Sequence, residues 1–325
     1  MTGVQTCALP IYTEQIVKIP SLETTARDGH TGDHSGKNTE HGKLTDTVEY
    51  HNLIPGKEYT VSGILIDRDT GKAVLMESGD PITASKKFKP ESDDGKIELE
   101  FTFDARLLAG KCVVVFEDCF HGEIKVASHS DIKDREQSVF YPGIETKATD
   151  ESKKRKNILL GSKTVINDEV MYANLIPNKE YEVAGVIIDK RTGSVLKDGK
   201  GKQVSSSVRF TPKTPDGSTD VVFKFDAAGM ESGDCVIFEE LRYQGMTIAE
   251  HKDINNSKQT VTILRNPPDN KSFTKKETVN KKGKRRISNN VKTGDSSSLR
   301  RLVAFFIFSQ LLLLVILKKR CRDLN

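Results

Sequence analysis

The chain has 325 residues, enough for two or three domains that each bury a core. Its 50 Lys and Arg residues nearly balance 46 Asp and Glu residues, which gives a formal net charge of +4, and Trp is absent. Apolar residues stand in short alternations of Val, Ile, Phe and Tyr that Gly, Pro and Asp interrupt. This pattern predicts all-β modules, and no segment with helical periodicity competes with it.

The N-terminal end resembles the remains of a truncated reading frame. Residues 1–11 show neither hydrophobic periodicity nor signal-peptide character, and they resemble a translated sequencing adapter. Residues 12–20 contain T-E-Q-I-V-K-I-P, which parallels R-E-Q-S-V-F-Y-P at 135–142. We therefore expect residues 12–20 to be the end of a preceding repeat, with any secretion signal lost upstream.

An internal repeat organises the rest of the chain. The stretch V-A-S-H-S-D-I-K-D-R-E-Q-S-V at 126–139 returns as I-A-E-H-K-D-I-N-N-S-K-Q-T-V at 248–261, so that matching residues lie 122 positions apart. This period predicts repeat 1 at residues 21–141 and repeat 2 at residues 142–263.

Each repeat has the pattern of short strands joined by turns. Both repeats open with an alternating segment after a Pro, S-L-E-T-T-A at 21–26 and G-I-E-T-K-A at 143–148. Two further strands flank Pro55-Gly56 and Pro177-Asn178, where Pro fixes φ and Gly or Asn tolerates a positive φ. About seven strands in a unit of about 120 residues predict tandem immunoglobulin-like β-sandwiches.

The cysteines do not suggest a disulfide framework. None of Cys112, Cys119 and Cys235 has a cysteine at the matching position of the other repeat. A bridge between Cys112 and Cys119 stays open, although we do not expect it.

Five polar positions keep the same residue type in both repeats. They are Thr24, Asp46, Glu117, His129 and Gln137 in repeat 1, and Thr146, Asp168, Glu239, His251 and Gln259 in repeat 2. An amide is a poor acyl donor, so attack by a Thr hydroxyl on a Gln carboxamide needs a base, polarisation of the carbonyl and an acid for the departing ammonia. His, Asp and Glu match those needs. The alternative is that all five are surface strand residues preserved in a recent duplication.

The Glu of this set lies in a strand that is otherwise mostly apolar. In V-V-V-F-E-D at 113–118, alternation places Glu117 on the same face as Val113 and Val115. A carboxylate on a buried face is costly unless it is paired or protonated. The neighbouring Asp118 leaves the assignment to Glu117 less certain than the other four.

These motifs resemble a known family. The V-x-F-E strand, the segment D-T-V-x-Y-x-N-L-x-P-G-K-x-Y and the closing H-x-D-I…Q are similar to VaFE repeats of thioester-containing and other Gram-positive surface adhesins, over nearly all of residues 21–262. The resemblance implies internal ester bonds that form without an external enzyme, from Thr24 to Gln137 and from Thr146 to Gln259. It implies His129 and His251 as proton shuttles. It also implies carboxyl pairs in which one member stays protonated and polarises the amide, namely Asp46 with Glu117 and Asp168 with Glu239.

A basic linker follows repeat 2, at residues 264–289, and contains K-K-E-T-V-N-K-K-G-K-R-R. Such a composition is typical of a disordered, solvated segment, which we expect to cross an anionic cell wall. Nucleic-acid binding is not expected, because Phe273 is the sole aromatic residue interleaved for stacking.

Residues 290–325 have three parts in the order of a cell-wall sorting signal. They are N-V-K-T-G at 290–294, an apolar run at 302–317 and a basic tail. In the Gram-positive surface proteins that this order resembles, sortase cleaves between Thr and Gly, here Thr293 and Gly294. Asn-Val stands where the common motif has Leu-Pro. The apolar run is short for a transmembrane helix of about twenty residues, and an ordinary tail-anchored membrane protein is the alternative.

Together these features predict the wall-anchored stalk of a bacterial surface adhesin, exposed on the cell surface of a Gram-positive bacterium. Sortase and peptidoglycan are the expected partners, with a host ligand bound through the missing N-terminal region. No cofactor or metal is expected, because the chain has no phosphate loop, zinc-ligand spacing or nucleophile elbow. Turnover catalysis is not expected either, since the reaction consumes its own residues. A glycan- or matrix-binding sandwich and a stalk with Lys–Asn isopeptide bonds remain the alternatives.

Overall fold

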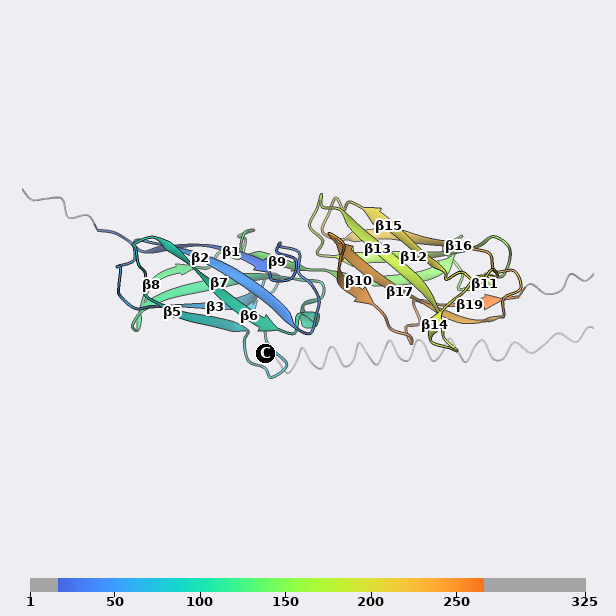
Figure 1. Ribbon diagram of the computed structural model, residues 1–325, viewed down its shortest axis with the longest axis horizontal. Coiled ribbons are helices and arrows are strands. Elements are labelled where there is room, and N and C mark those ends of the chain that lie inside the picture. The colour runs from blue at the N-terminus through green and yellow to red at the C-terminus, as the bar shows by residue number, and fades with distance from the viewer. Residues whose placement is uncertain (1–16, 266–325) are drawn as a thin grey trace, which may run out of the picture. The chain divides into compact units, whose positions relative to one another are not determined.

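The computed structural model describes residues 17–265, which form two β-sandwiches in tandem (Figure 1). The prediction of tandem all-β modules is confirmed. The suspected adapter residues, nearly all of the basic linker, the Thr293–Gly294 pair and the apolar run at 302–317 lie outside the described residues. Within residues 17–265, no helix is long and apolar enough to cross a membrane.

Repeat 1 consists of nine strands and one short 3-10 helix. The strands are β1 (Ser21–Asp28), β2 (Gly42–His51), β3 (Tyr59–Asp67), β4 (Lys72–Ala73), β5 (Thr83–Phe88), β6 (Gly95–Phe103), β7 (Lys111–His121), β8 (Ile124–His129) and β9 (Ser138–Tyr141), and the helix is η1 (Ala105–Leu108). One sheet has the order β1-β2-β6. The other has the order β4-β3-β7-β8, with β5 also pairing with β3 and β9 with β7.

Repeat 2 follows the same plan with one added strand. Its strands are β10 (Gly143–Asp150), β11 (Asn157–Leu159), β12 (Thr164–Ala173), β13 (Tyr181–Asp189), β14 (Ser194–Val195), β15 (Ser205–Phe210), β16 (Gly217–Phe225), β17 (Gly233–Tyr243), β18 (Met246–His251) and β19 (Thr260–Leu264). One sheet is β10-β12-β16, and the other is β11-β19-β17-β13-β14, with β15 on β13 and β18 on β17. The added strand β11 pairs in parallel with β19.

Alternation along the strands places the core between the two sheets of each repeat. In β2 every second residue is buried, and Leu44 and Val48 are fully inaccessible. They pack in one cluster with Val61 and Leu65 of β3, from the opposite sheet. Because side chains of a strand alternate between its faces, a polar residue in the inward register must also enter this core.

The turns adopt the backbone conformations that their residues predict. Gly56 has φ of 74° and Asn178 has φ of 64° at the matching position, and Gly71 and Gly193 have φ of 66° and 68°. These values lie in the left-handed region that Gly and Asn tolerate best. The predicted turns are therefore confirmed.

The three cysteines of the described residues are buried free thiols. The alternative of a Cys112–Cys119 bridge is therefore wrong. Cys112 lies near the start of β7 and Cys119 near its end, so that most of the strand separates them.

Candidate functional site

The five repeated polar residues come from both sheets of each sandwich. In repeat 1, Thr24 lies on β1 and Asp46 on β2 of the three-stranded sheet. Glu117 on β7 stands directly opposite His129 on β8 in the other sheet. Gln137 occupies the turn immediately before β9. The fold therefore brings together residues that lie up to 113 positions apart in the sequence.

Four of the five residues are buried in each repeat. Thr24 is 7% exposed, Glu117 is 1% exposed, and Asp46 and Gln137 are fully inaccessible. The corresponding four residues of repeat 2 are all fully inaccessible. The alternative that these are surface strand residues is therefore wrong. The adjacent Thr25 is only partly buried, so Thr24 is the hydroxyl that faces the core.

In repeat 2, the hydroxyl and the carboxamide meet at one carboxyl oxygen. Glu239 Oε2 accepts a hydrogen bond from Thr146 Oγ1 at 3.3 Å and another from Gln259 Nε2 at 2.6 Å. The side chains of Thr146 and Gln259 are therefore neighbours, although they belong to the first strand and the last turn of the repeat.

In repeat 1, the same two side chains bond to the two members of the carboxyl pair. Thr24 Oγ1 donates to Glu117 Oε2 at 3.4 Å, and Gln137 Nε2 donates to Asp46 Oδ1 at 3.4 Å. Both bonds are long, but all four residues belong to the five positions that are identical in the two repeats.

Backbone hydrogen bonds hold the Gln-bearing turn against both sheets. In repeat 1, Ala26 of β1 donates its N–H to the carbonyl of Glu136 at 2.8 Å, and Val115 of β7 donates to the carbonyl of Gln137 at 3.2 Å. Ala148 and Ile237 make the matching bonds in repeat 2. The turn thus bridges the strand that carries Thr and the strand that carries Glu.

One carboxyl of each pair must hold a proton. Asp46 Oδ2 and Glu117 Oε1 are buried, and no donor reaches them from any other described residue. Burial raises the pKa of both groups; the charge of Asp46 and a hydrogen bond to it raise the pKa of Glu117 further, whereas the bond from Glu117 partly lowers that of Asp46. Two buried carboxylates cannot both ionise at close range. We therefore assign the proton to Glu117 and the charge to Asp46.

In repeat 2, Glu239 holds the proton of the carboxyl pair that it forms with Asp168. Burial raises the pKa of Glu239, and the hydrogen bond and charge of Asp168 raise it further. Burial also raises the pKa of Asp168, while the bond from Glu239 and the charge of Lys156 partly offset this rise. Neither oxygen of Asp168 has another donor among the described residues. A neutral Glu239 can therefore accept the hydrogen bond from the Gln259 amide without placing a second charge in the core.

The imidazoles lie at the edge of the site with different partners in the two repeats. His129 Nε2 is 2.9 Å from Asp134 Oδ2, whereas His251 Nε2 is 3.1 Å from Asn256 Nδ2. Burial lowers the pKa of His251, so that it is neutral at pH 7 and able to accept a proton.

Asp134 and Asn256 are functional candidates that the sequence analysis missed. Both follow the His by five residues, but a search for identical residues at matching positions excludes them because one is Asp and the other Asn. The carboxylate of Asp134 can only accept, so it places the proton of a neutral His129 on Nε2 and leaves Nδ1 free as a base. Asn256 Oδ1 accepts from two backbone N–H groups, which turns its amide nitrogen toward His251 Nε2. That contact favours the opposite tautomer.

Both repeats match one known protein family. A family model described as "T-Q ester bond containing domain" matches residues 20–141 and again residues 142–263. The chain belongs to this family. No curated protein matches the chain.

Solved structures that match the chain include proteins of three bacteria. A bacterial adhesin from Mobiluncus mulieris, described as containing intramolecular disulfide, isopeptide, and ester bond cross-links, is 15% identical, with 70% of this chain and 82% of that chain covered and a TM-score of 0.34. The Streptococcus agalactiae AgI/II polypeptide BspA C-terminal domain is 9% identical over 75% of this chain and 99% of that chain, with a TM-score of 0.35. The C-terminal domain of the Streptococcus pyogenes antigen I/II-family protein AspA is 10% identical over 76% and 99%, with a TM-score of 0.35.

The two T-Q domains are expected to differ in rate because of the residue beside each His. We expect Asp134→Asn to slow ester formation in repeat 1 by roughly 10²-fold, because it removes the partner that keeps Nδ1 free. The reciprocal Asn256→Asp should accelerate repeat 2. Mass spectrometry of each cross-linked peptide, sampled during cell-free synthesis, measures both rates in one chain. Equal rates in all variants would exclude a role for this position.

The buried carboxyl pairs predict how stability depends on pH in a chain that cannot cross-link. In Thr24→Ala/Thr146→Ala, the raised pKa values of Glu117 and Glu239 contribute stability that is full below the usual Glu pKa of about 4.3 and is lost as pH rises. The slope should approach about 1.4 kcal/mol per pH unit for each Glu. Chemical denaturation from pH 7 upward measures it, because the pKa of Asp46 is raised to about 6 and adds a slope of its own below that pH.

A matched control lies beside Glu239 in the sequence. Adding Glu117→Gln/Glu239→Gln should remove this slope. Glu240 bonds to Lys252 and Arg242, which lower its pKa to about 2, so its contribution is lost as pH falls. Glu240→Gln should therefore leave the alkaline slope intact. A slope that persists in the double Gln variant would contradict the assigned protons.

Proposed function

We propose that each repeat forms an ester between its Thr and Gln side chains, and that the chain is a load-bearing stalk of a bacterial surface adhesin. The convergence of Thr146 and Gln259 on one oxygen of Glu239 is the observation that supports this most directly. Reacting groups that are already neighbours in a buried site gain the advantage of proximity. Membership of the T-Q ester bond containing domain family supports the same chemistry.

The residues of repeat 2 suffice for the reaction steps. His251 would take the proton of the Thr146 hydroxyl on Nδ1 as Oγ1 attacks the Gln259 carboxamide carbon, in the tautomer that the Asn256 contact disfavours, so this step should be slower than in repeat 1. Glu239 would turn its proton from Asp168 to the amide oxygen and stabilise the negative charge that develops there. The C–N bond then breaks, and the His returns its proton to the nitrogen, which leaves as ammonia. One hydroxyl and one amide yield one ester and one ammonia, and the site is consumed after a single turnover.

The bond closes a large loop in each repeat. Thr24 and Gln137 lie 113 residues apart. In the loop-entropy model, closing a loop of this length stabilises the folded state by about 4–5 kcal/mol. The ester also joins the first strand to the turn before the last strand, which belong to different sheets.

The position of the ester determines how the repeat carries force. Tension that enters at β1 would pass from Thr24 to Gln137 through the ester, and then along residues 138–145 to Thr146 and the second ester. The other strands of each sandwich are bypassed. This path suits a stalk that is pulled from its two ends.

The anchoring of the stalk rests on the C-terminal sequence. Thr293 and Gly294 precede an apolar run and a basic tail in the order of a sorting signal. We propose that sortase joins Thr293 to peptidoglycan at the cell surface and that the basic segment crosses the wall. A host ligand would bind through an upstream region.

The isopeptide alternative lacks a suitable lysine in the described part of the chain. None of the buried polar side chains of residues 17–265 is a Lys. Lys147, which follows Thr146, is exposed. A lysine must be desolvated to lose its proton and attack an amide at neutral pH. The glycan- or matrix-binding alternative stays a prediction.

Stretching a single molecule tests the load-bearing role. The protein should show no unfolding step for the segment between Thr24 and Gln137, because the ester bypasses it. The variant Thr24→Ala/Thr146→Ala should release about 370 Å of chain in each repeat. Thr25→Ala, which changes the neighbouring hydroxyl, should behave as the unmodified protein does. Full extension of both repeats in the unmodified protein would contradict the proposal.

A further inference from the structure

The connection between the first two strands of each repeat runs beside the Gln-bearing segment. In repeat 1, Ser35 forms a parallel bridge with Phe140, and Phe140 donates its N–H to the carbonyl of His34 at 2.7 Å. In repeat 2, the same connection forms β11, which pairs in parallel with β19, and Thr262 donates its N–H to the carbonyl of Lys156 at 2.8 Å. His34 and Lys156 occupy matching positions, 122 residues apart.

Lys156 binds the backbone on both sides of Gln259. Its Nζ donates hydrogen bonds to the carbonyls of Ser257 at 2.5 Å, Lys258 at 2.6 Å and Thr260 at 3.2 Å. Two of these carbonyls precede the Gln and one follows it. One ammonium group therefore saturates its three donors on the segment that carries the proposed acyl donor.

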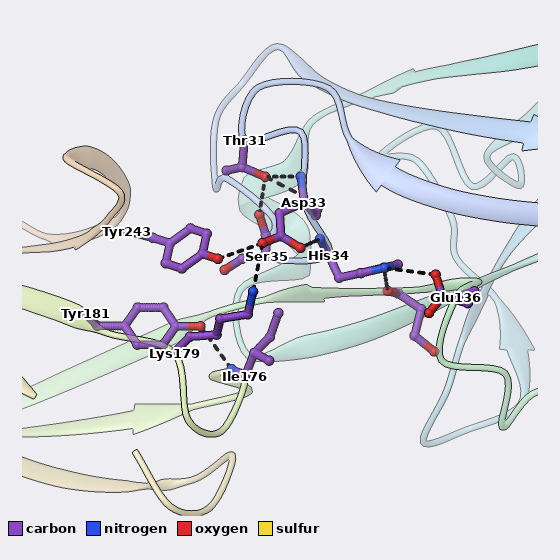
Figure 2. A network of polar contacts seen from close by, with 10 residues as sticks. Thr31, Asp33, His34, Ser35, Glu136, Ile176, Lys179, Tyr181 and Tyr243 are labelled. Atoms are coloured by element: carbon purple, nitrogen blue, oxygen red, sulfur yellow. Dashed lines mark hydrogen bonds and ion pairs between the residues drawn. The ribbon is translucent and has the colours of Figure 1, made fainter. Parts of the chain in front are cut away.

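His34 makes the corresponding contacts in repeat 1. Its Nδ1 is 2.9 Å from the carbonyl oxygen of Ser138, which follows Gln137, and its Nε2 is 3.5 Å from the carboxylate of Glu136, which precedes it. Figure 2 shows the imidazole of His34 turned toward Glu136 with both contacts drawn. The His34 side chain is 18% exposed, whereas the Glu136 side chain is largely exposed, so the contact with the Ser138 carbonyl is the better shielded of the two.

The Gln-bearing turn needs such support because it lacks strand pairing of its own. Residues 257–259 lie in a turn between the end of β18 and the start of β19. The carboxamide must be held near the hydroxyl, and a misplacement of about 1 Å can cost about 10²-fold in rate. A cation that binds carbonyls on both sides of the Gln fixes the backbone from which that carboxamide extends.

We propose that the residue at position 34 or 156 is a positioning residue for ester formation, acting as a clamp on the backbone that flanks the reactive Gln. The inference rests on the proposed ester chemistry. The clamp touches neither the hydroxyl nor the carboxamide, so it acts through the placement of Gln137 or Gln259. Repeat 1 uses an imidazole that contacts one carbonyl and one carboxylate, and repeat 2 uses an ammonium group that contacts three carbonyls.

The test compares the rates of the two repeats within one full chain. Lys156→Met keeps the length of the side chain but removes its donors, and it should slow Thr146–Gln259 cross-linking by about tenfold or more while Thr24–Gln137 cross-linking is unchanged. Lys156→His introduces the residue that repeat 1 uses and should restore most of the rate. Lys154→Met, at an exposed neighbouring position, serves as the control. Cross-linked peptides are quantified by mass during cell-free synthesis.

A second pair of variants separates positioning from folding. In the Thr146→Ala background, where no ester can form in repeat 2, the melting temperature reports the structural effect of Lys156→Met alone. In repeat 1, His34→Leu should slow cross-linking, and His34→Lys should retain it. Cross-linking at the unmodified rate in both Lys156→Met and His34→Leu would overturn the clamp. A slowing in Lys156→Met that Lys156→His does not rescue would also overturn it. Absence of both esters in the unmodified chain would instead refute the proposed function.

Discussion

A buried pair of carboxyl groups between two sheets is the constraint on which each repeat depends. Asp46 and Glu117 come from opposite sheets. One oxygen of each, Asp46 Oδ2 and Glu117 Oε1, receives no hydrogen bond from any other described residue. Such a pair is tolerated in a core only if one member is neutral. The pair contacts both the Thr and the Gln of its repeat, so the feature that is costly for folding lies at the proposed site of the reaction. Once the ester forms, the covalent bond secures the sheets around this unfavourable pair.

The two repeats share the same five site residues but differ in the residues that contact them. Thr, Asp, Glu, His and Gln are identical in type, whereas the partner of the His changes from Asp134 to Asn256 and the clamp changes from His34 to Lys156. The five identical residues would react or touch the reacting atoms. The two that differ act on orientation, where more than one side chain can serve. Under the proposed function, the repeats would form the same bond with different kinetics and would carry force along the same path once the bond is made.

Most of the architecture could be predicted from the sequence because the chain contains two copies of one fold, which align at an offset of 122 residues. Alternation placed Glu117 inward, and the structure finds it 1% exposed. Asp134 and His34 were not predicted, because the matching residues of repeat 2 are of other types. Several residue types can form hydrogen bonds to an imidazole or to carbonyls, so their identity need not be kept. Pairing across the sheets also escaped the comparison of the two copies. Alternation says which face a side chain occupies, but not that Gln259 and Thr146 meet at the same oxygen of Glu239.

The central claim is that a covalent bond joins Thr to Gln in each repeat, and intact mass tests it most directly. The account predicts that the protein is lighter than its sequence by the mass of two ammonias, and that Thr24→Ala/Thr146→Ala has the full mass of its sequence. Treatment with hydroxylamine should open both bonds, because an ester reacts where an isopeptide does not. A protein of full sequence mass, or a deficit that survives both the Thr substitutions and hydroxylamine, would contradict the account.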